Sequence, residues 1–165
     1  SFDQISQSIG TTTTHPEEAD QAITNLAIKI DSAQLKELYS KITSQKFSGD
    51  DKLLATELLI RSPLAGSLNY LKQIASQSAE EIAAHSSVNQ QEFQAIQMIA
   101  VEGLAQKPQF KNEAKAALNE LSQKTEDPVL LDRIHRTRLT LDGKVSPPEV
   151  QDQKALEQVL RKHTR

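Results

Sequence analysis

Apolar residues recur at helical spacing along most of the chain, in runs separated by short polar joints. Ile23, Leu26, Ala27 and Ile30, for example, follow the i, i+3, i+4, i+7 pattern that gathers side chains on one face of a helix. No segment shows the alternation of apolar and polar residues, bounded by turn residues, that is typical of a strand. The pattern therefore predicts an all-α protein of about eight helices.

Prolines and capping residues mark where these helices begin. Proline suits the first helical turn, because the N–H that it lacks would have no partner there. A Ser, Asn or Asp just before a helix can accept a hydrogen bond from one of its first N–H groups. Besides a short amphipathic segment at residues 2–9, the expected helices run from about Pro16 to Ile30, from Asp31 or Ser32 to Gln45, from the Ser48 cap to Arg61, from Ser62-Pro63 as one long helix to His85, from Asn89 to Lys107, from about Phe110 to Leu121, from Asp127-Pro128 to Asp142-Gly143, and from Ser146-Pro147-Pro148 onward.

The short joints favour pairing of these helices into antiparallel hairpins. Apolar residues make up 37% of the chain, which is below the share of about 45–50% usual in globular domains. A stack in which each unit touches only its neighbours needs fewer apolar residues than a sphere does. We therefore expect an irregular, α-solenoid-like stack of hairpins. Its four hairpin starts, near Pro16, Ser48, Asn89 and Asp127, are spaced by roughly 32–40 residues, as in helical-hairpin repeats.

The first fifteen residues differ from the rest. Residues 11–14 are four threonines in a row, a polar low-complexity stretch of the kind found in linkers. We expect residues 1–15 to form a polar arm and residues 16–165 to form one helical-repeat-like domain. Because the chain starts at Ser1, either an upstream segment has been removed or this is an excised piece. The sequence leaves the cellular location open, with export slightly favoured over the cytoplasm.

Part of the sequence resembles known helical repeats. The segment from Ala114 to Leu141 resembles the junction between two HEAT-type repeats, and the segment from Ala95 to Pro128 resembles a tetratricopeptide unit less closely. The resemblance implies an α-solenoid architecture and a binding role. The residues that carry it are Phe110, Ala114, Ala117-Leu118, Leu121, Asp127-Pro128, Leu130, Leu131 and Arg133.

Basic residues are concentrated toward the end of the chain. The net charge is −3, yet residues 1–127 carry 11 Lys and Arg against 17 Asp and Glu, whereas residues 128–165 carry 8 against 5. Arginine suits bidentate recognition of carboxylate or phosphate. One interpretation is a docking patch for an acidic peptide, a partner domain or an anionic membrane; the other is ordinary internal ion pairs on a solvated face.

Four arginines are the candidate partner-binding residues of this patch. Arg133 and Arg136 are i, i+3 neighbours and should share a helix face. Arg138 is four residues after Ile134, so we expect it near the buried stripe and within reach of an acid of the preceding hairpin. The fourth candidate is Arg161, in the last expected helix.

No catalytic or metal-binding motif accompanies these helices. The chain has no cysteine, its histidines lack ligand spacing, and its adjacent acidic pairs point about 100° apart on a helix and do not converge. We expect no cofactor and no metal. Gly66 and Gly103 fall inside expected helices, where close helix packing explains them better than a ligand does.

The leading functional prediction is a non-enzymatic scaffold that binds another protein or a peptide. The alternative is a compact helical domain that has a structural or anchoring role, either as part of a longer chain or in an exported, lipid-tethered protein. An enzyme with dispersed catalytic residues is a remote third interpretation. The negative net charge disfavours specific nucleic-acid binding, and no apolar run approaches the ~18 residues of a membrane span.

Overall fold

The computed structural model describes residues 16–85 and 89–143. Within these ranges the protein consists of α-helices and one short 3-10 turn, without a strand, which confirms the all-α prediction. The helices expected at residues 2–9 and from Ser146 onward, and with them Arg161, lie outside the described residues. The described helices are α2 (Pro16–Lys29), α3 (Ser32–Ile42), α4 (Gly49–Arg61), α5 (Ala65–Ser76), α6 (Ala79–His85), α7 (Gln90–Leu104), α8 (Lys111–Lys124) and α9 (Pro128–Leu141), with the 3-10 turn η1 (Pro108–Phe110) before α8.

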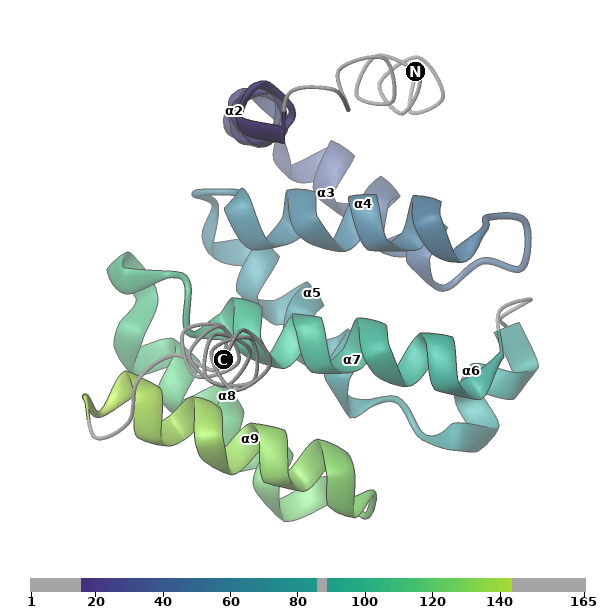
Figure 1. Cartoon of the computed structure of the whole chain (residues 1–165), viewed down its shortest axis with the longest axis vertical. Helices are drawn as coiled ribbons and strands as arrows, with labels where there is room; N and C mark the ends of the chain where they lie inside the picture. Colours follow the sequence, from purple (N-terminus) through teal and green to yellow (C-terminus); the bar gives the residue numbers. More distant parts are fainter. Residues whose placement is uncertain (1–15, 86–88, 144–165) are drawn as a thin grey trace, which may run out of the picture.

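The helices are arranged in two rows (Figure 1). In the nearer row α2 packs on α4, α4 on α7 and α7 on α9, so helices far apart in sequence lie side by side. Behind them, α3 packs on α5 and α5 on α8. The rows are joined chiefly where α3 and α5 meet α4, where α5 meets α7, and where α8 meets α9. The middle helices of the nearer row, α4 and α7, therefore have neighbours above, below and behind them.

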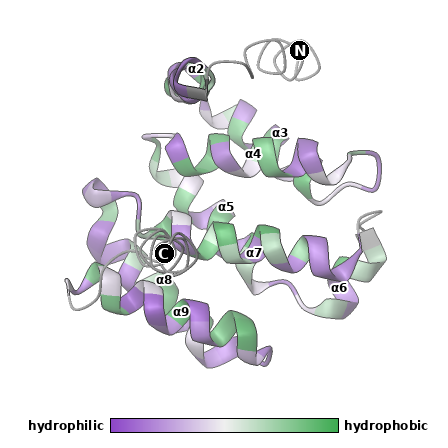
Figure 2. Cartoon of the chain, viewed as in Figure 1, coloured by the Kyte–Doolittle hydropathy of each residue, from purple (hydrophilic) through white to green (hydrophobic). Residues whose placement is uncertain are grey.

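The core lies between the two rows. Figure 2 shows helices with hydrophobic residues on some faces and hydrophilic residues on others, as their sequence pattern requires. Leu59 of α4, Leu71 of α5, Phe93 of α7 and Leu118 of α8 are among the fully buried side chains. The helix α4 contacts α2, α3, α5 and α7. This central position explains why Leu58, Leu59 and Ile60 of α4 are all buried.

The capping residues identified from the sequence act as expected. The Asp31 carboxylate accepts a hydrogen bond from the Gln34 N–H at 2.8 Å, and the Gln34 side chain accepts one from the Asp31 N–H in return. Asn89 caps α7 at 2.8 Å through the Glu92 N–H. The Asp127 carboxylate caps α9 by accepting a hydrogen bond from the Val129 N–H at 2.9 Å. Such caps satisfy N–H groups that have no partner within the helix.

The prediction of a single long helix between Ser62-Pro63 and His85 is wrong. The chain leaves the helical conformation at Gln77, and two helices, α5 and α6, result. The Ser78 hydroxyl accepts a hydrogen bond from the Glu81 N–H and so starts α6. The amide nitrogen of Gln97 donates to carbonyl oxygens at the end of α5, which a continuous helix would have used itself. The apolar stripe continues across the break, so the sequence pattern alone does not reveal it.

The two helical glycines have different surroundings. A Cβ atom on Gly103 would lie 2.8 Å from Cδ1 of Ile60, closer than real Cβ contacts come. The helices α4 and α7 therefore need a glycine there, as expected. At Gly66 the nearest atom would be Cδ1 of Leu35 at 4.0 Å, which is an ordinary contact. Close packing does not explain Gly66.

Candidate functional site

A cleft of about 620 Å³ opens at one end of the helices, where α5 ends and α6, α7 and α9 begin. Its volume falls within the range of about 300–1,000 Å³ that is typical of ligand sites. Ala75, Ile82 and Leu130 line it with apolar surface and are themselves buried. Polar residues of the α5–α6 and α8–α9 joints complete its walls. The cleft thus combines an apolar base with a polar rim.

Four glutamines of α7 line this cleft: Gln90, Gln91, Gln94 and Gln97. Their spacing of i, i+1, i+4 and i+7 places them along one face of the helix. Gln90 and Gln91 are exposed at the rim, and the Gln94 amide nitrogen donates to the Asp127 carboxylate across the joint to α9. Each side-chain amide offers two donors and an acceptor, the groups that pair with a polypeptide main chain.

Gln97 lies deepest of the four, with only 4% of its surface exposed. Its Nε2 donates to the Ile74 carbonyl at 3.1 Å and to the Gln77 carbonyl at 2.9 Å. These bonds engage its donors fully. Its Oε1 accepts no hydrogen bond from any residue of the described ranges, although a buried polar atom normally has a partner.

The charges around the cleft are unequal. Lys124 lines it, but its Nζ lies 2.9 Å from the Glu120 carboxylate, which also binds Lys72. The hydrogen bonds from Lys124 and Lys72 lower the pKa of Glu120. Glu126 also lines the cleft and is exposed, and it forms no ion pair within the part of the chain that the structure describes. Together with the Asp127 carboxylate, it leaves the cleft with an excess of negative charge.

The three predicted arginines of α9 do not form one free cationic patch. Arg133 forms an ion pair with Glu102 of α7, and the Nε of Arg136 lies 3.2 Å from Asp132 on its own helix. Arg138 is half-buried and pairs with no acid of the described residues. The expectation that Arg138 reaches the preceding hairpin is therefore wrong, and Arg133 makes that contact.

The position of the buried stripe of α9 explains this difference. Its buried residues are Leu130, Ile134 and Thr137. Arg133 is the i+3 neighbour of Leu130 and the i−4 neighbour of Thr137, so it stands beside the stripe and faces α7. The acidic partner of Arg133 comes from 31 residues earlier in the chain, which no local pattern could indicate.

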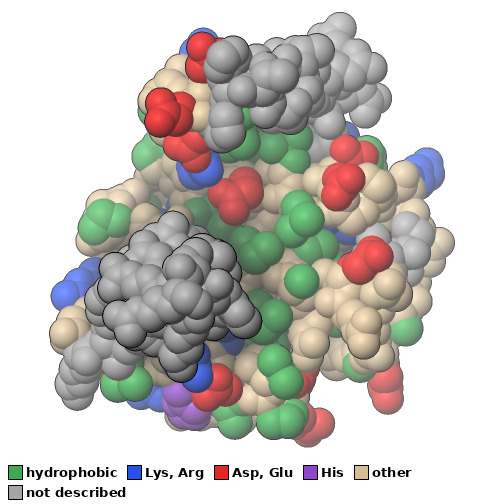
Figure 3. Space-filling model, in the orientation of Figure 1, with side chains coloured by type: hydrophobic (Ala, Val, Ile, Leu, Met, Phe, Trp, Pro, Cys, Tyr) green, Lys and Arg blue, Asp and Glu red, His purple; other side chains and the backbone are tan. Residues whose placement is uncertain are grey.

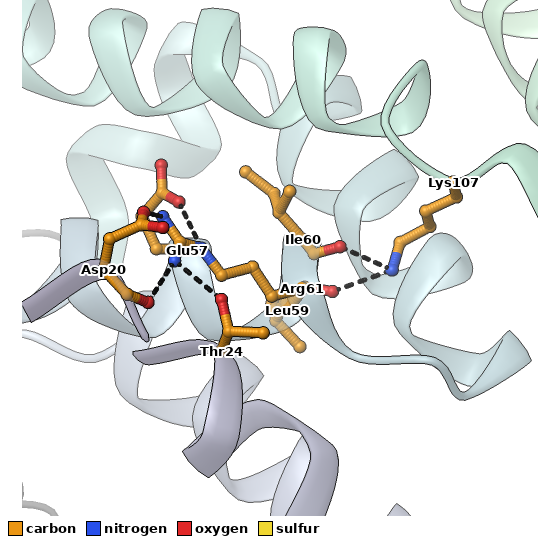
Figure 4. A network of polar contacts seen from close by, with 7 residues as sticks. All are labelled: Asp20, Thr24, Glu57, Leu59, Ile60, Arg61 and Lys107. Carbon is orange, nitrogen blue, oxygen red and sulfur yellow. Dashed lines mark hydrogen bonds and ion pairs between the residues drawn. The ribbon is translucent and has the colours of Figure 1, made fainter. Parts of the chain in front are cut away.

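A separate polar network joins α2 to α4 (Figure 4). The Arg61 guanidinium, at the end of α4, donates to the Asp20 carbonyl at 2.8 Å and to the Thr24 hydroxyl at 3.0 Å. It also lies 2.7 Å from the Asp20 carboxylate and 3.4 Å from the Glu57 carboxylate. One arginine thus ties two turns of α2 to the core helix α4.

Lys107 occupies the other side of the same helix end. Its side chain is fully buried, and its Nζ donates to the carbonyls of Leu59, Ile60 and Ser62 at 3.0, 2.9 and 2.7 Å. The last carbonyls of a helix have no partner within it, so Lys107 caps α4 from a distant joint. Burial lowers the pKa of Lys107 to about 8. In the sequence, Lys107 indicated only the end of the helix that begins at Asn89.

The described residues contain neither a metal-binding cluster nor a membrane-spanning helix. Across residues 16–85 and 89–143, no three His, Asp or Glu side chains meet in a way that could hold a metal ion. The same part of the chain contains no helix with the length and apolar character of a membrane span.

The chain was compared with known proteins at three levels. No protein-family model matches it. No curated protein is significantly similar to it in sequence, and no solved structure matches its fold significantly.

Proposed function

We propose that this protein is a non-enzymatic binding module that holds a segment of another protein in the cleft between α6, α7 and α9. The observation that carries the proposal is the glutamine-lined cleft of about 620 Å³. Its apolar base can bury side chains, and the exposed amides of Gln90 and Gln91 can pair with main-chain groups.

The arrangement of the helices supports the same proposal. Stacked helical hairpins present rigid, extended surfaces, and we propose that the two rows of this fold act as such a stack. Figure 3 shows one such surface: hydrophobic side chains gather in the middle of this face, over α4 and α7, with Asp and Glu side chains around them. The capped helices that build the cleft fix its walls before a ligand arrives, which lowers the entropy cost of binding.

The test is a selection of random peptides on the full chain, followed by affinity measurements. Gln91→Trp fills the rim of the cleft, and Gln106→Trp is the matched control, because Gln106 is exposed near the other end of α7 and outside the cleft lining. We expect selected peptides to lose about tenfold or more in affinity for Gln91→Trp and to bind the control normally. The proposal fails if no selected peptide is sensitive to Gln91→Trp.

A further inference from the structure

The cleft has a chemical preference that its amides alone do not define. Gln97 is the most buried polar residue that lines it, and its Oε1 is an acceptor without a donor among the described residues. The acid at the rim of the cleft, Glu126, has no ion-pair partner in the same part of the chain. Both groups would be satisfied by a ligand that brings N–H donors and positive charge.

We propose that the cleft accepts a lysine or arginine side chain from an extended segment of the partner protein. This inference rests on the proposed binding function and adds the chemistry of the partner. The cationic head would donate toward Gln97 Oε1 or the Glu126 carboxylate. Its aliphatic stem would lie in the cleft over Ala75, Ile82 and Leu130, which line it and are themselves almost completely buried. Long basic side chains commonly bury their stems in this way and keep the charge near polar groups.

An anionic ligand fits this cleft less well, although two well-formed helices begin there. At the start of α7, Asn89 accepts the hydrogen bond of the Glu92 N–H. At the start of α9, Asp127 accepts those of the Val129 and Leu130 N–H groups. The N–H groups of Glu92, Val129 and Leu130 are therefore engaged and do not bind an anion. The positive end of the α9 dipole is also offset by the Asp127 carboxylate.

Lys124 does not oppose a cationic ligand strongly. Its ammonium group lies 2.9 Å from the Glu120 carboxylate, which also binds Lys72, so its charge is partly offset. The neighbouring Glu126 has no such partner in the described ranges. The local balance at the α8–α9 joint is thus negative, and it complements a basic side chain.

The experiment uses fluorescent peptides of about nine residues that share one Gly-Ser-Ala frame and differ only in a central Arg, Lys, Gln or Glu pair. Binding to the full-length chain is measured by fluorescence anisotropy at low and at high salt. The test variant is Glu126→Lys. The matched control is Glu113→Lys, because Glu113 is exposed on α8, lies outside the cleft lining and has no ion pair in the described residues.

We expect the Arg and Lys peptides to bind and the Glu peptide not to bind. Glu126→Lys should weaken the basic peptides about five- to thirtyfold, and Glu113→Lys by less than about twofold. Salt should weaken the wild-type interaction, because the contact is partly exposed. Gln91→Trp should block the same peptides.

Two outcomes would overturn the preference for a basic side chain without overturning the proposed binding function. If the Gln or Glu peptide binds as well as the basic ones and Gln91→Trp blocks it, the cleft binds peptides but does not prefer a cation. If the basic peptides do not bind, or bind Glu126→Lys unchanged, the preference is absent. The binding function itself is judged by the random-peptide selection, which is not restricted to basic sequences.

Discussion

Replacing Lys107 with methionine tests the unusual cap of α4. The substitution keeps a long, flexible and largely apolar stem in the same buried position but removes the three hydrogen bonds to the carbonyls of Leu59, Ile60 and Ser62. All three of these residues are almost completely buried. Their carbonyls would therefore lose a partner in a place where water cannot readily replace it.

Two opposing effects set how much Lys107→Met changes the free energy of unfolding. Leaving a buried carbonyl unsatisfied costs about 1–3 kcal/mol, so three of them cost roughly 3–9 kcal/mol. The ammonium group itself is expensive to bury, as its pKa of about 8 indicates. Removing it returns about 3 kcal/mol, since each pKa unit corresponds to about 1.4 kcal/mol. We expect Lys107→Met to destabilise the fold by about 3 kcal/mol, because the lost hydrogen bonds outweigh the relieved burial of charge.

The assay is urea unfolding at neutral pH, followed by circular dichroism at the helical band. The control is Lys111→Met, because Lys111 is exposed at the start of α8 and forms no ion pair within the described residues. The control should stay within about 0.5 kcal/mol of the wild type. A Lys107→Met protein as stable as the control, or more stable than the wild type, would show that the cap contributes nothing net and would refute this reasoning.

Three further predictions follow from the same contacts. The folded-state pKa of Lys107 lies near 8, below its unfolded value of 10.5, so the unfolded state binds more protons between these pH values. The wild type should therefore gain up to about 3 kcal/mol of stability over Lys107→Met as pH rises through this window, as measured by parallel urea titrations. Arg61→Gln should accelerate amide hydrogen exchange in α2 at least about tenfold while α7 is unchanged, because the network of Figure 4 ties α2 to α4; equal protection in both proteins would contradict that role. Arg133→Glu should destabilise the domain by about 1–3 kcal/mol, since it opposes Glu102 across the α7–α9 contact, whereas Arg136→Glu on the exposed face should cost less than about 0.5 kcal/mol in thermal unfolding; equal losses would argue against the Arg133 ion pair.

The sequence was a good guide wherever the signal is local. A helix start depends on residues within one turn of each other, so the caps at Asp31, Asn89 and Asp127 could be identified from neighbouring letters. The helical spacing of apolar residues likewise predicted the all-α fold. The glutamines along one face of α7 were visible in the sequence in the same way, but nothing local showed that this face borders a cleft.

Tertiary structure decided what depends on groups distant in the chain. The end of α5 is fixed by a glutamine about 20 residues later, and the end of α4 by a lysine 45 to 48 residues later. The arginine that contacts the preceding hairpin was Arg133 rather than Arg138, because the rotation of α9 on α7 follows from packing of both helices. A buried donor and a distant carbonyl find each other only when intervening helices bring them together. The sequence by itself thus determined the helices and most of their starts, whereas only the packed fold determined the helix break, the remote caps and the cleft.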